Sequence, residues 1–316
     1  MYETQFPLFY NPKEGIAPSI GVAVITYAAK DLLPFCLPRL FSSKLKPKVL
    51  VVNSTSNDGT VEVARGLGAD ILLLPTDEFN HGLTREKARR HLNTDIVVMM
   101  TPDAYPAHDE MLEALVLPLI TGVASVSYAR QLPHEGANFF EAFAREFNYP
   151  KTSHLRSVKD IDTYGIYTYF CSDSCAAYVS SALDAIGGFD NVLSGEDTVA
   201  VAKLLPIGGK VAYVAAAMVK HSHGYTLLQE FRRHFDTGYA RKQYRHLFCS
   251  SQGDHRRGAE YTRSLFKKTW KEKKELLPYA FLQTIVKYCG YALGQRSVRW
   301  PKWIAKRFSG QTHYWK

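Results

Sequence analysis

The sequence predicts an α/β protein with a mostly parallel central sheet, helices on both faces of that sheet, and a basic helical extension at the C-terminus. Short, continuously apolar segments typical of buried strands alternate with helix-like segments over the first 120 residues. Basic residues concentrate at the other end, where residues 255–316 hold fifteen Lys and Arg against three acidic residues. We therefore expect a main domain at residues 1–250 and a basic extension at 251–316.

The first half of the chain predicts four buried strands, at 20–25, 48–52, 70–74 and 96–100. Helix-like patterns at 60–67 and 83–91 lie between them, and this alternation favours a parallel sheet. In such sheets ligands bind beyond the carboxyl ends of the strands. Polar side chains follow three of the predicted strands at these ends: Thr26 and Tyr27, Asn53, and Asp103.

The second half is less regular. Apolar periodicity predicts helices at 109–119, 138–147, 181–186 and 198–205, and strands at 123–128 and 210–219. The segment 165–179 reads as rich in strand, and the two glycines at 187–188 predict a turn. From residue 226 onward the pattern is helical, with a break expected at 253–258.

The charge distribution points to an anionic partner for the extension. Residues 255–316 carry a net charge of +12, and the rest of the chain carries about −3. A basic segment with aromatic residues fits an anionic membrane surface or nucleic acid. Because the sequence has no nucleic-acid-binding motif, we do not expect a nucleic-acid partner. Apolar residues recur at helical spacing at Phe281, Ile285, Tyr288 and Ala292, which suits an interfacial anchor, docking on the core or contact within a homo-oligomer.

Composition places the protein among ordinary globular proteins, with 46% hydrophobic and 22% charged residues. Residues 1–10 do not resemble a secretory signal, and the apolar stretch 279–293 is too short and too interrupted to span a membrane. The five cysteines show neither zinc-ligand spacing nor an even number for disulfides. We expect a cytoplasmic protein, with peripheral attachment to the inner membrane as the role of an interfacial anchor.

Three short segments contain residue types that are common in active sites: the acidic pair Glu196-Asp197, the isolated Asp103 and the sequence His221-Ser222-His223. Carboxylates with an imidazole suit Mg²⁺ or Mn²⁺, and a further ionised carboxylate can take a proton from a hydroxyl group. Together these residues indicate group transfer from a phosphate-bearing donor. An alternative is that the acidic pair only caps the helix at 198–205. Because alternate residues of a strand face opposite sides, we expect only one of the two histidines to be a ligand.

Two polar segments are candidates for binding a nucleotide. Residues 53–60 follow a predicted strand, and Asp58 or Thr60 can cap the next helix; an ordinary polar turn is the alternative. Residues 80–85 include Gly82 at a helix start, with Arg85 one turn further on. From that position the guanidinium group can reach phosphate or ribose oxygens.

Taken in order, these segments resemble the inverting family 2 glycosyltransferases of the GT-A fold, and more narrowly their bacterial rhamnosyltransferase branch. The resemblance extends from residue 20 to about 244 and rests on the following segments: Val-Ile-Thr-Tyr at 24–27, the polar turn at 53–60, Asn-His-Gly-Leu-Thr-Arg at 80–85, Thr-Pro-Asp-Ala at 101–104, the segment 170–190 ending in Gly-Gly-Phe-Asp, Glu196-Asp197, His-Ser-His-Gly-Tyr-Thr at 221–226 and Phe-Arg-Arg-His-Phe-Asp-Thr-Gly at 231–238.

The resemblance implies a donor site, a metal site and a catalytic base. A nucleotide sugar would be bound by Thr26, Tyr27, Asn53, Asp58, Asn80, Gly82, Arg85 and Asp103. Mg²⁺ or Mn²⁺ would be held by Asp103, His221 and His223. Asp197 would act as the base, with Glu196 as the alternative. The activity implied is transfer of rhamnose from dTDP-rhamnose to a hydroxyl of a growing surface glycan (O-antigen, capsule or exopolysaccharide), presented on an undecaprenyl lipid.

Two residues depart from the family pattern. Asn53 stands where the family usually has an Asp that reads the base, so base recognition is expected to differ. Thr101 replaces the first acid of the Asp-x-Asp motif and leaves Asp103 as its single carboxylate. These departures motivate an alternative, in which the protein keeps the fold and binds nucleotide sugars or glycans without catalysing transfer.

Overall fold

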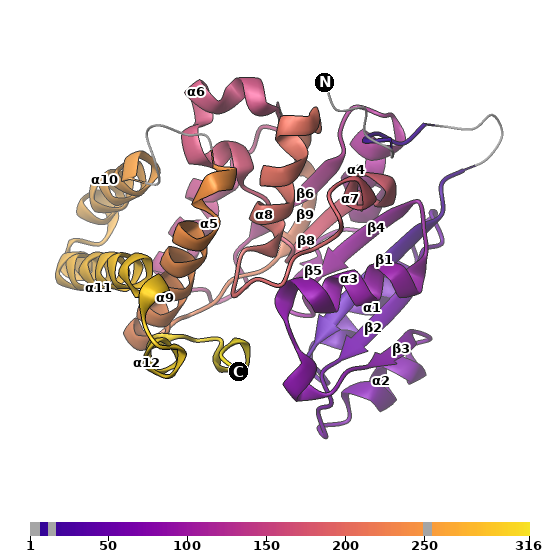
Figure 1. The fold of residues 1–316 in the computed structure, drawn as a ribbon, viewed down its shortest axis with the longest axis horizontal. Coiled ribbons are helices and arrows are strands. Elements are labelled where there is room, and N and C mark those ends of the chain that lie inside the picture. Colours follow the sequence, from indigo (N-terminus) through magenta and orange to yellow (C-terminus); the bar gives the residue numbers. More distant parts are fainter. Residues whose placement is uncertain (1–6, 12–16, 249–254) are drawn as a thin grey trace.

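The computed structural model describes residues 7–11, 17–248 and 255–316. Figure 1 shows one twisted sheet with helices packed around it. The strands are β1 (Ile20–Thr26), β2 (Lys48–Asn53), β3 (Asp70–Leu73), β4 (Ile96–Met100), β5 (Tyr105–Pro106), β6 (Val126–Leu132), β7 (His154–Arg156), β8 (Cys175–Val179) and β9 (Val211–Lys220). Their order is β3-β2-β1-β4-β8-β6-β9-β5, with β7 paired to β9 outside this path.

The sheet is mostly parallel, as predicted. Strands β1 to β4, β6 and β9 run in one direction, and β5, β7 and β8 run against them. All seven residues of β1 and all five of β4 are buried, which explains their continuously apolar sequences. Asp103 lies just beyond the end of β4, and Asn53 is the last residue of β2, so both occupy the predicted edge of the sheet.

The helices predicted in the first half are present. They are α2 (Thr60–Gly66), α3 (His81–Leu92) and α4 (Met111–Ile120). A further helix, α1 (Leu33–Phe41), was not predicted, because Pro38 lies inside it and proline usually interrupts a helix. Four residues of α1 are fully buried, so packing against the core offsets the lost backbone hydrogen bond.

The second half adds α5 (Phe139–Asn148), α6 (Ile161–Tyr164), α7 (Ser180–Ala185) and α8 (Glu196–Leu204). The segment 165–179, predicted to be rich in strand, forms a strand only at 175–179, and residues 165–169 form a short 3₁₀ helix. Gly165 has a φ of 55°, which turns the chain away from the sheet, and Tyr167 and Tyr169 pack inward as side chains of a turn.

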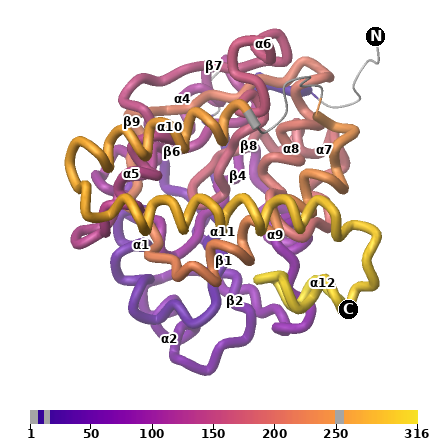
Figure 2. The backbone as a smooth tube through the Cα atoms, turned by 90° about the vertical axis from the view of Figure 1, so that its left-hand side faces the viewer, coloured from indigo at the N-terminus to yellow at the C-terminus, as the bar shows by residue number. Residues whose placement is uncertain are grey.

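The C-terminal helices are α9 (Leu227–Gln243), α10 (His255–Glu272), α11 (Leu277–Arg296) and α12 (Lys302–Phe308). Of the predicted break at 253–258, Gly258 lies inside α10, and residues 249–254 lie outside the described residues. In Figure 2, α11 crosses the molecule alongside α9. Within the described parts of the chain, no helix is both long and apolar enough to cross a membrane.

Helix α11 packs on α9 at backbone contact. A Cβ atom placed on Gly294 would lie 2.0 Å from the carbonyl oxygen of Phe235, and one on Gly290 would lie 2.4 Å from that of Phe231. Further along, the Asp236 carboxylate accepts a hydrogen bond from the backbone nitrogen of Gly310 (2.9 Å), and Trp315 is buried near Phe235. Helix α11 is therefore docked on the core through its glycine face, while Phe281, Ile285 and Tyr288 of the predicted apolar stripe stay exposed.

Candidate active site

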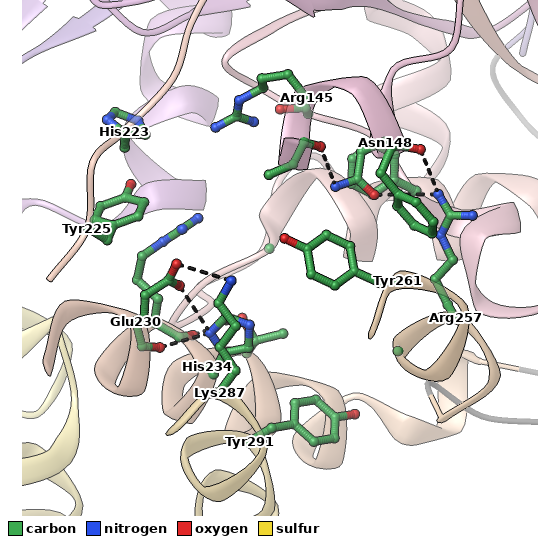
Figure 3. Close-up of a pocket in the computed structure, with 18 of the residues that line it drawn as sticks. Arg145, Asn148, His223, Tyr225, Glu230, His234, Arg257, Tyr261, Lys287 and Tyr291 are labelled. Carbon is green, nitrogen blue, oxygen red and sulfur yellow. Dashed lines mark hydrogen bonds and ion pairs between the residues drawn. The ribbon is translucent and has the colours of Figure 1, made fainter. Parts of the chain in front are cut away.

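One cavity of about 1170 Å³ contains both Asp103 and Asp197. The loop after β4 supplies Asp103, and the first turn of α8 supplies Asp197. Helices α5, α9, α10 and α11 form much of the remaining wall, and Figure 3 shows residues from these helices around the cavity. The sequence analysis placed the lone aspartate and the acidic pair at one site, and the structure brings Asp103 and Asp197 together there.

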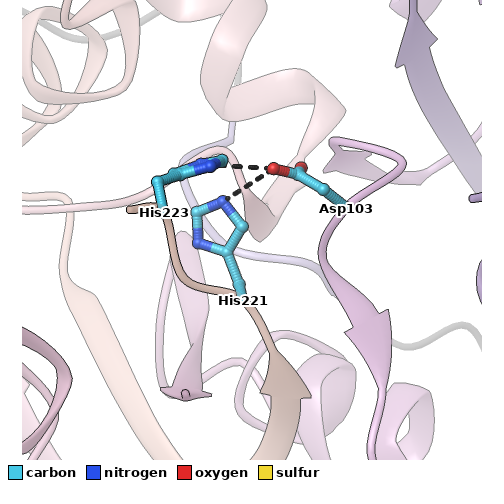
Figure 4. A group of neighbouring side chains, drawn as sticks. All are labelled: Asp103, His221 and His223. Carbon is cyan, nitrogen blue, oxygen red and sulfur yellow. Dashed lines mark ion pairs between the residues drawn. The ribbon is translucent and has the colours of Figure 1, made fainter. Parts of the chain in front are cut away.

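Asp103, His221 and His223 form a compact group (Figure 4). Oδ2 of Asp103 lies 3.4 Å from Nε2 of His221 and 3.2 Å from Nε2 of His223. The expectation that the two imidazoles lie on opposite faces of a strand was wrong, because β9 ends at Lys220 and the strand alternation does not continue through residues 221–226. All three side chains offer a ligand atom within 4.8 Å of the others.

The side chain of Gln131 determines which nitrogen of His221 faces Asp103. Oε1 of Gln131 lies 2.8 Å from Nδ1 of His221 and also accepts a hydrogen bond from Nη1 of Arg145 (2.6 Å). Since an amide oxygen only accepts, Nδ1 of His221 carries the proton and Nε2 presents a lone pair to the Asp103 carboxylate.

This arrangement fits a divalent cation. A lone pair on Nε2 of His221 and a carboxylate oxygen repel each other unless a positive charge lies between them. Burial, followed by the neighbouring His221, lowers the pKa of His223 to about 4, and burial lowers the pKa of His221. Both imidazoles are therefore neutral at pH 7, which is the form that binds metals. The residues present suit Mg²⁺ or Mn²⁺.

Asp197 has the position and the acidity of a general base. Its Oδ1 accepts a hydrogen bond from the backbone nitrogen of Thr198 (2.6 Å), and its Oδ2 accepts one from that of Asp173 (3.2 Å). Burial, together with the charge of Glu196, raises the pKa of Asp197 to about 6. At pH 7 the carboxylate is largely ionised yet basic enough to take a proton from a hydroxyl group.

Glu196 does not line the cavity. Its Oε1 forms an ion pair with Nη1 of Arg85 at 3.0 Å, and both side chains are buried. Burial is the largest single influence and raises the pKa of Glu196, but the charges of Arg85 and His81 and two backbone hydrogen bonds together lower it below its usual value. Of the two acidic residues, Asp197 is the one whose side chain reaches the cavity.

Arg85 has a different environment from the one expected. Its Nε lies 3.1 Å from Oδ2 of Asp173, in addition to the ion pair with Glu196, and its side chain is 4% exposed. Oδ1 of Asp173 accepts a hydrogen bond from the hydroxyl of Tyr178 (2.5 Å). The guanidinium group is therefore occupied by two carboxylates behind Asp197, and it does not face the cavity where a phosphate could bind.

Asn80 and Gly82 also have structural contacts, in the cap of α3 and in its packing against residues 190–192. Oδ1 of Asn80 caps α3 by accepting hydrogen bonds from Gly82 (3.1 Å) and Leu83 (3.0 Å), and its Nδ2 donates to the Val192 carbonyl at 3.0 Å. A Cβ atom on Gly82 would lie 1.8 Å from the carbonyl oxygen of Asp190. Segment 80–85 thus holds the loop that precedes the acidic pair, which differs from the predicted contact with a nucleotide.

The remaining candidates lie at the ends of β1 and β2, outside the cavity lining. The hydroxyl of Thr26 donates to the carbonyl of Val52 (3.0 Å), and Tyr27 is 65% exposed. Asn53 is buried, and its Nδ2 has no partner among the described residues. An unsatisfied buried amide at a strand end is a suitable contact for a polar ligand.

Asp58 shapes the turn between β2 and α2. It accepts hydrogen bonds from the hydroxyls of Thr60 and Ser56, both at 2.7 Å, and from the backbone of Lys30 at 3.2 Å. These hydrogen bonds, with that of Thr60 the strongest, lower the pKa of Asp58. Asp58 therefore orders the polar turn, while the N-cap position of α2 is Gly59 and not Asp58 or Thr60, the two residues that the sequence had suggested.

Sequence reasoning missed Gln131, Asp173, Arg145 and Arg233 as residues of this site. Asp173 lies between two serines in an otherwise apolar segment, and this polar interruption is a signal that could have identified it. Gln131 and Arg145 lie in a strand and a helix with no unusual spacing, so the sequence contains no comparable signal for them.

The sheet order and its likeness to solved structures show that this chain has the GT-A fold. Several solved structures share this fold, among them the following two. A mannosyltransferase, PcManGT from Pyrobaculum calidifontis, has a TM-score of 0.54 at 15% identity and covers 93% of this chain and 77% of its own. Residues 1–349 of TarS from S. aureus have a TM-score of 0.53 at 15% identity, and the match covers 89% of this chain and 91% of the TarS chain.

The sequence matches the glycosyl transferase family 2 profile over residues 21–187, and the chain belongs to this family. Two relatives match it over most of their length. The O-antigen chain rhamnosyltransferase RfbN of Salmonella typhimurium is 35% identical over 304 residues, covering 94% of this chain and 96% of the relative. The O-antigen chain rhamnosyltransferase WbaN of Salmonella anatum is 34% identical over 270 residues, covering 85% of this chain and 86% of the relative.

Proposed function

We propose that this protein is an inverting rhamnosyltransferase that transfers rhamnose from dTDP-rhamnose to a hydroxyl group of a bacterial surface glycan. The observation that carries the proposal is the presence of Asp103 and Asp197 in one cavity of a family 2 chain. The substrate class is supported by two relatives that are O-antigen chain rhamnosyltransferases. The alternative of a catalytically inactive binding protein has no comparable support.

In the proposed reaction, Asp197 removes the proton of the acceptor hydroxyl while that oxygen attacks the anomeric carbon. The bond from this carbon to the phosphate oxygen breaks, and its electron pair leaves with the diphosphate. Because attack comes from the face opposite the leaving group, the configuration at the anomeric carbon inverts. Asp103, His221 and His223 would hold Mg²⁺ or Mn²⁺, which neutralises charge on the diphosphate.

On the donor side, Thr26, Tyr27 and Asn53 would contact the base and ribose. The free Nδ2 of Asn53 can donate a hydrogen bond to a carbonyl oxygen of the base, while its Oδ1 already accepts one from the Ser56 hydroxyl at 3.0 Å. This contact uses an amide in place of the carboxylate that is usual in the family, so it contributes a hydrogen bond without a charge.

The experiment that tests the function is a transfer and hydrolysis assay. Purified protein with Mg²⁺ or Mn²⁺ is incubated with a panel of nucleotide sugars that includes dTDP-rhamnose, and release of the nucleoside diphosphate is measured. We expect release from dTDP-rhamnose above that from UDP- and GDP-sugars. Release from none of them would contradict the enzyme proposal, and preference for another donor would contradict the choice of rhamnose.

A separate prediction concerns the metal affinity of the site formed by Asp103, His221 and His223. Replacing Gln131 with Leu removes the acceptor that fixes the orientation of His221, and losses of such supporting contacts typically weaken metal affinity roughly 10- to 100-fold. We expect this weakening in Mn²⁺ titrations followed by electron paramagnetic resonance, and a larger one in His223→Ala. His108→Ala is the matched control, since His108 also lies 3.4 Å from a carboxylate, that of Glu110, but outside the cavity. Equal Mn²⁺ affinity in all three variants would contradict the site.

The exposed face of α11 would make a peripheral membrane contact, which would bring the enzyme to an undecaprenyl-linked acceptor. Helix α11 exposes Phe281 (60%), Leu282 (46%) and Ile285 (42%), and Trp270 and Trp303 are exposed at its flanks. Lys and Arg residues are frequent in the segments that precede α11 and continue from its end, at 263–274 and 296–307, and would attract an anionic surface.

A vesicle assay tests this contact. In the double variant Phe281→Ser, Ile285→Ser, we expect binding to phosphatidylglycerol vesicles to weaken by about tenfold or more, because burying each apolar side chain contributes roughly 1.5–3 kcal/mol. Leu117→Ser is the control, as Leu117 is also well exposed but lies on α4, in the catalytic core. Vesicle binding that is unchanged in the double variant would exclude α11 as the anchor.

A further inference from the structure

Two of the arginines that line the cavity, Arg145 and Arg233, form no ion pair with the carboxylates of the described residues. Arg145 comes from α5 and Arg233 from α9, and both line the cavity beside Asp103. Buried Arg85 and Arg89 each contact two carboxylates, whereas neither Arg145 nor Arg233 forms an ion pair with an acidic residue in the described part of the chain. Nε of Arg145 is buried without a hydrogen-bond partner. Unpaired guanidinium groups in a concave site favour an anionic ligand.

Arg145 reaches the metal site through one residue. Its Nη1 donates to Oε1 of Gln131, which holds His221, and His221 lies 3.4 Å from Asp103. A single nitrogen of the guanidinium group is used in this chain of contacts, and the group can donate from its other nitrogens. In Figure 3, Arg145 extends toward the space beside His223 and Tyr225.

Arg233 reaches the same site from the opposite wall. Its guanidinium carbon lies 4.2 Å from the centre of the Tyr225 ring, and that ring lies 5.0 Å from the ring of His223. Nε2 of His223 is 3.2 Å from Asp103. Both arginines therefore connect to Asp103, each through side chains that touch a metal-site histidine, and neither contacts Asp197.

The sequence of α9 explains why only one of its two adjacent arginines faces the cavity. Residues Glu230, Arg233, Thr237 and Arg241 recur at helical spacing and line the cavity. Phe231 and Phe235 lie on the other side, against α11. Arg232 lies outside the cavity lining. It lies near the C-terminal tail, since a Cβ atom placed on Gly310 would be 3.6 Å from the Cβ atom of Arg232. Arg232 is thus a control of identical chemistry, one residue away.

We propose that Arg145 and Arg233 bind the diphosphate of the nucleotide donor on two sides of the metal site and stabilise the charge it gains as it leaves. This inference rests on the proposed function. When the bond between the anomeric carbon and the phosphate oxygen breaks, its electron pair stays on the diphosphate, whose negative charge increases. Guanidinium groups donate paired hydrogen bonds to phosphate oxygens, and here they add two positive charges to that of the metal.

The connection of both arginines to Asp103 argues for the donor diphosphate over a phosphate on the acceptor. An acceptor must place its hydroxyl at Asp197, on the face of the sugar opposite the leaving group. The arginines would therefore act on the departing group, while Asp197 acts on the attacking one.

Calorimetric titration with dTDP at saturating Mn²⁺ tests the proposal. For Arg145→Gln and Arg233→Gln we expect roughly 10- to 100-fold weaker dTDP binding, the range for losing a hydrogen bond to a charged group. Thymidine, which has no phosphate, should bind all variants as it binds the wild type. Arg232→Gln should bind dTDP with wild-type affinity, and Arg233→Lys should recover part of the loss. Thermal unfolding of each variant shows that it remains folded at the titration temperature.

The outcomes separate this inference from the proposed function. Wild-type dTDP affinity in both glutamine variants would overturn the inference and leave the rhamnosyltransferase proposal standing. An equal loss of thymidine and dTDP affinity would also overturn it, since it would assign the arginines a structural role. Failure of the wild-type protein to bind dTDP would overturn both, because the donor would then be another nucleotide or none.

Discussion

Replacing Asp197 with Asn is expected to lower kcat by roughly 10²- to 10⁴-fold, the usual contribution of a general base. Asn keeps the size of the side chain and can still accept the hydrogen bond from Thr198 or Asp173, so the fold and the affinity for dTDP should change little. The measurement is steady-state transfer with the preferred donor, alongside calorimetric binding of dTDP. Asp184→Asn is the control, because it removes a carboxylate that pairs with Arg89 at 2.9 Å but lies outside the cavity.

The pH profile of the wild type provides a second measurement of the same role. A base must be ionised to act, and burial and Glu196 raise the pKa of Asp197 to about 6. Activity should therefore be level above this pH and fall about tenfold per unit below it. The residual activity of Asp197→Asn should lack this acid limb. A variant that keeps the limb, or that transfers at the wild-type rate, would show that another group is the base.

Replacing Arg85 with Gln is expected to lower the free energy of unfolding by about 3–5 kcal/mol, the usual cost of leaving buried charges without a partner. Glu196 and Asp173 would both lose their cation, at side chains that are almost wholly buried. Arg90→Gln is the matched control on the same helix. Arg90 pairs with Glu86 at 2.6 Å but its side chain is 70% exposed, so its loss should cost no more than about 1 kcal/mol. Urea unfolding at pH 7 measures both.

The deficit of Arg85→Gln should depend on pH. In the wild type, Arg85 lowers the pKa of Glu196, so the ion pair stabilises the fold above the unfolded-state pKa and loses this effect as the pH falls. In the variant, the uncompensated carboxylates take up protons more readily, so the difference from wild type should shrink as the pH falls through about 4 to 5. Unchanged stability combined with weaker dTDP binding would contradict this account and support the phosphate contact expected from the sequence.

Much of the architecture could be predicted from the sequence because it depends on local patterns. Buried parallel strands such as β1 and β4 must be apolar along their whole length, and helices between them show their periodicity directly. The structure differs from the prediction where packing outweighs the local helix propensity, as in α1, which is a buried helix although it contains Pro38. The alternation rule for His221 and His223 failed because it depends on where β9 ends.

The residues of the candidate site also differ in whether the sequence could predict their roles. The sequence indicated Asp103 and the two histidines at the ends of predicted strands and Asp197 at the start of a predicted helix, since these residue types suit metal binding and proton transfer. It misassigned Arg85, because the distance from Arg85 to Asp173 and Glu196 is set by the packing of α3 against α8 and the loop before β8.

The sequence by itself determined the fold class, the helical extension and the kinds of chemical group available at the sheet edge. These follow from hydrophobic periodicity and residue type, which act over a few neighbouring positions. Only the tertiary structure decided which groups meet: Gln131 with His221, Arg145 and Arg233 with the metal site, and α11 with α9. The physical reason is that such contacts depend on distances between elements far apart in the chain, and local propensities do not encode those distances.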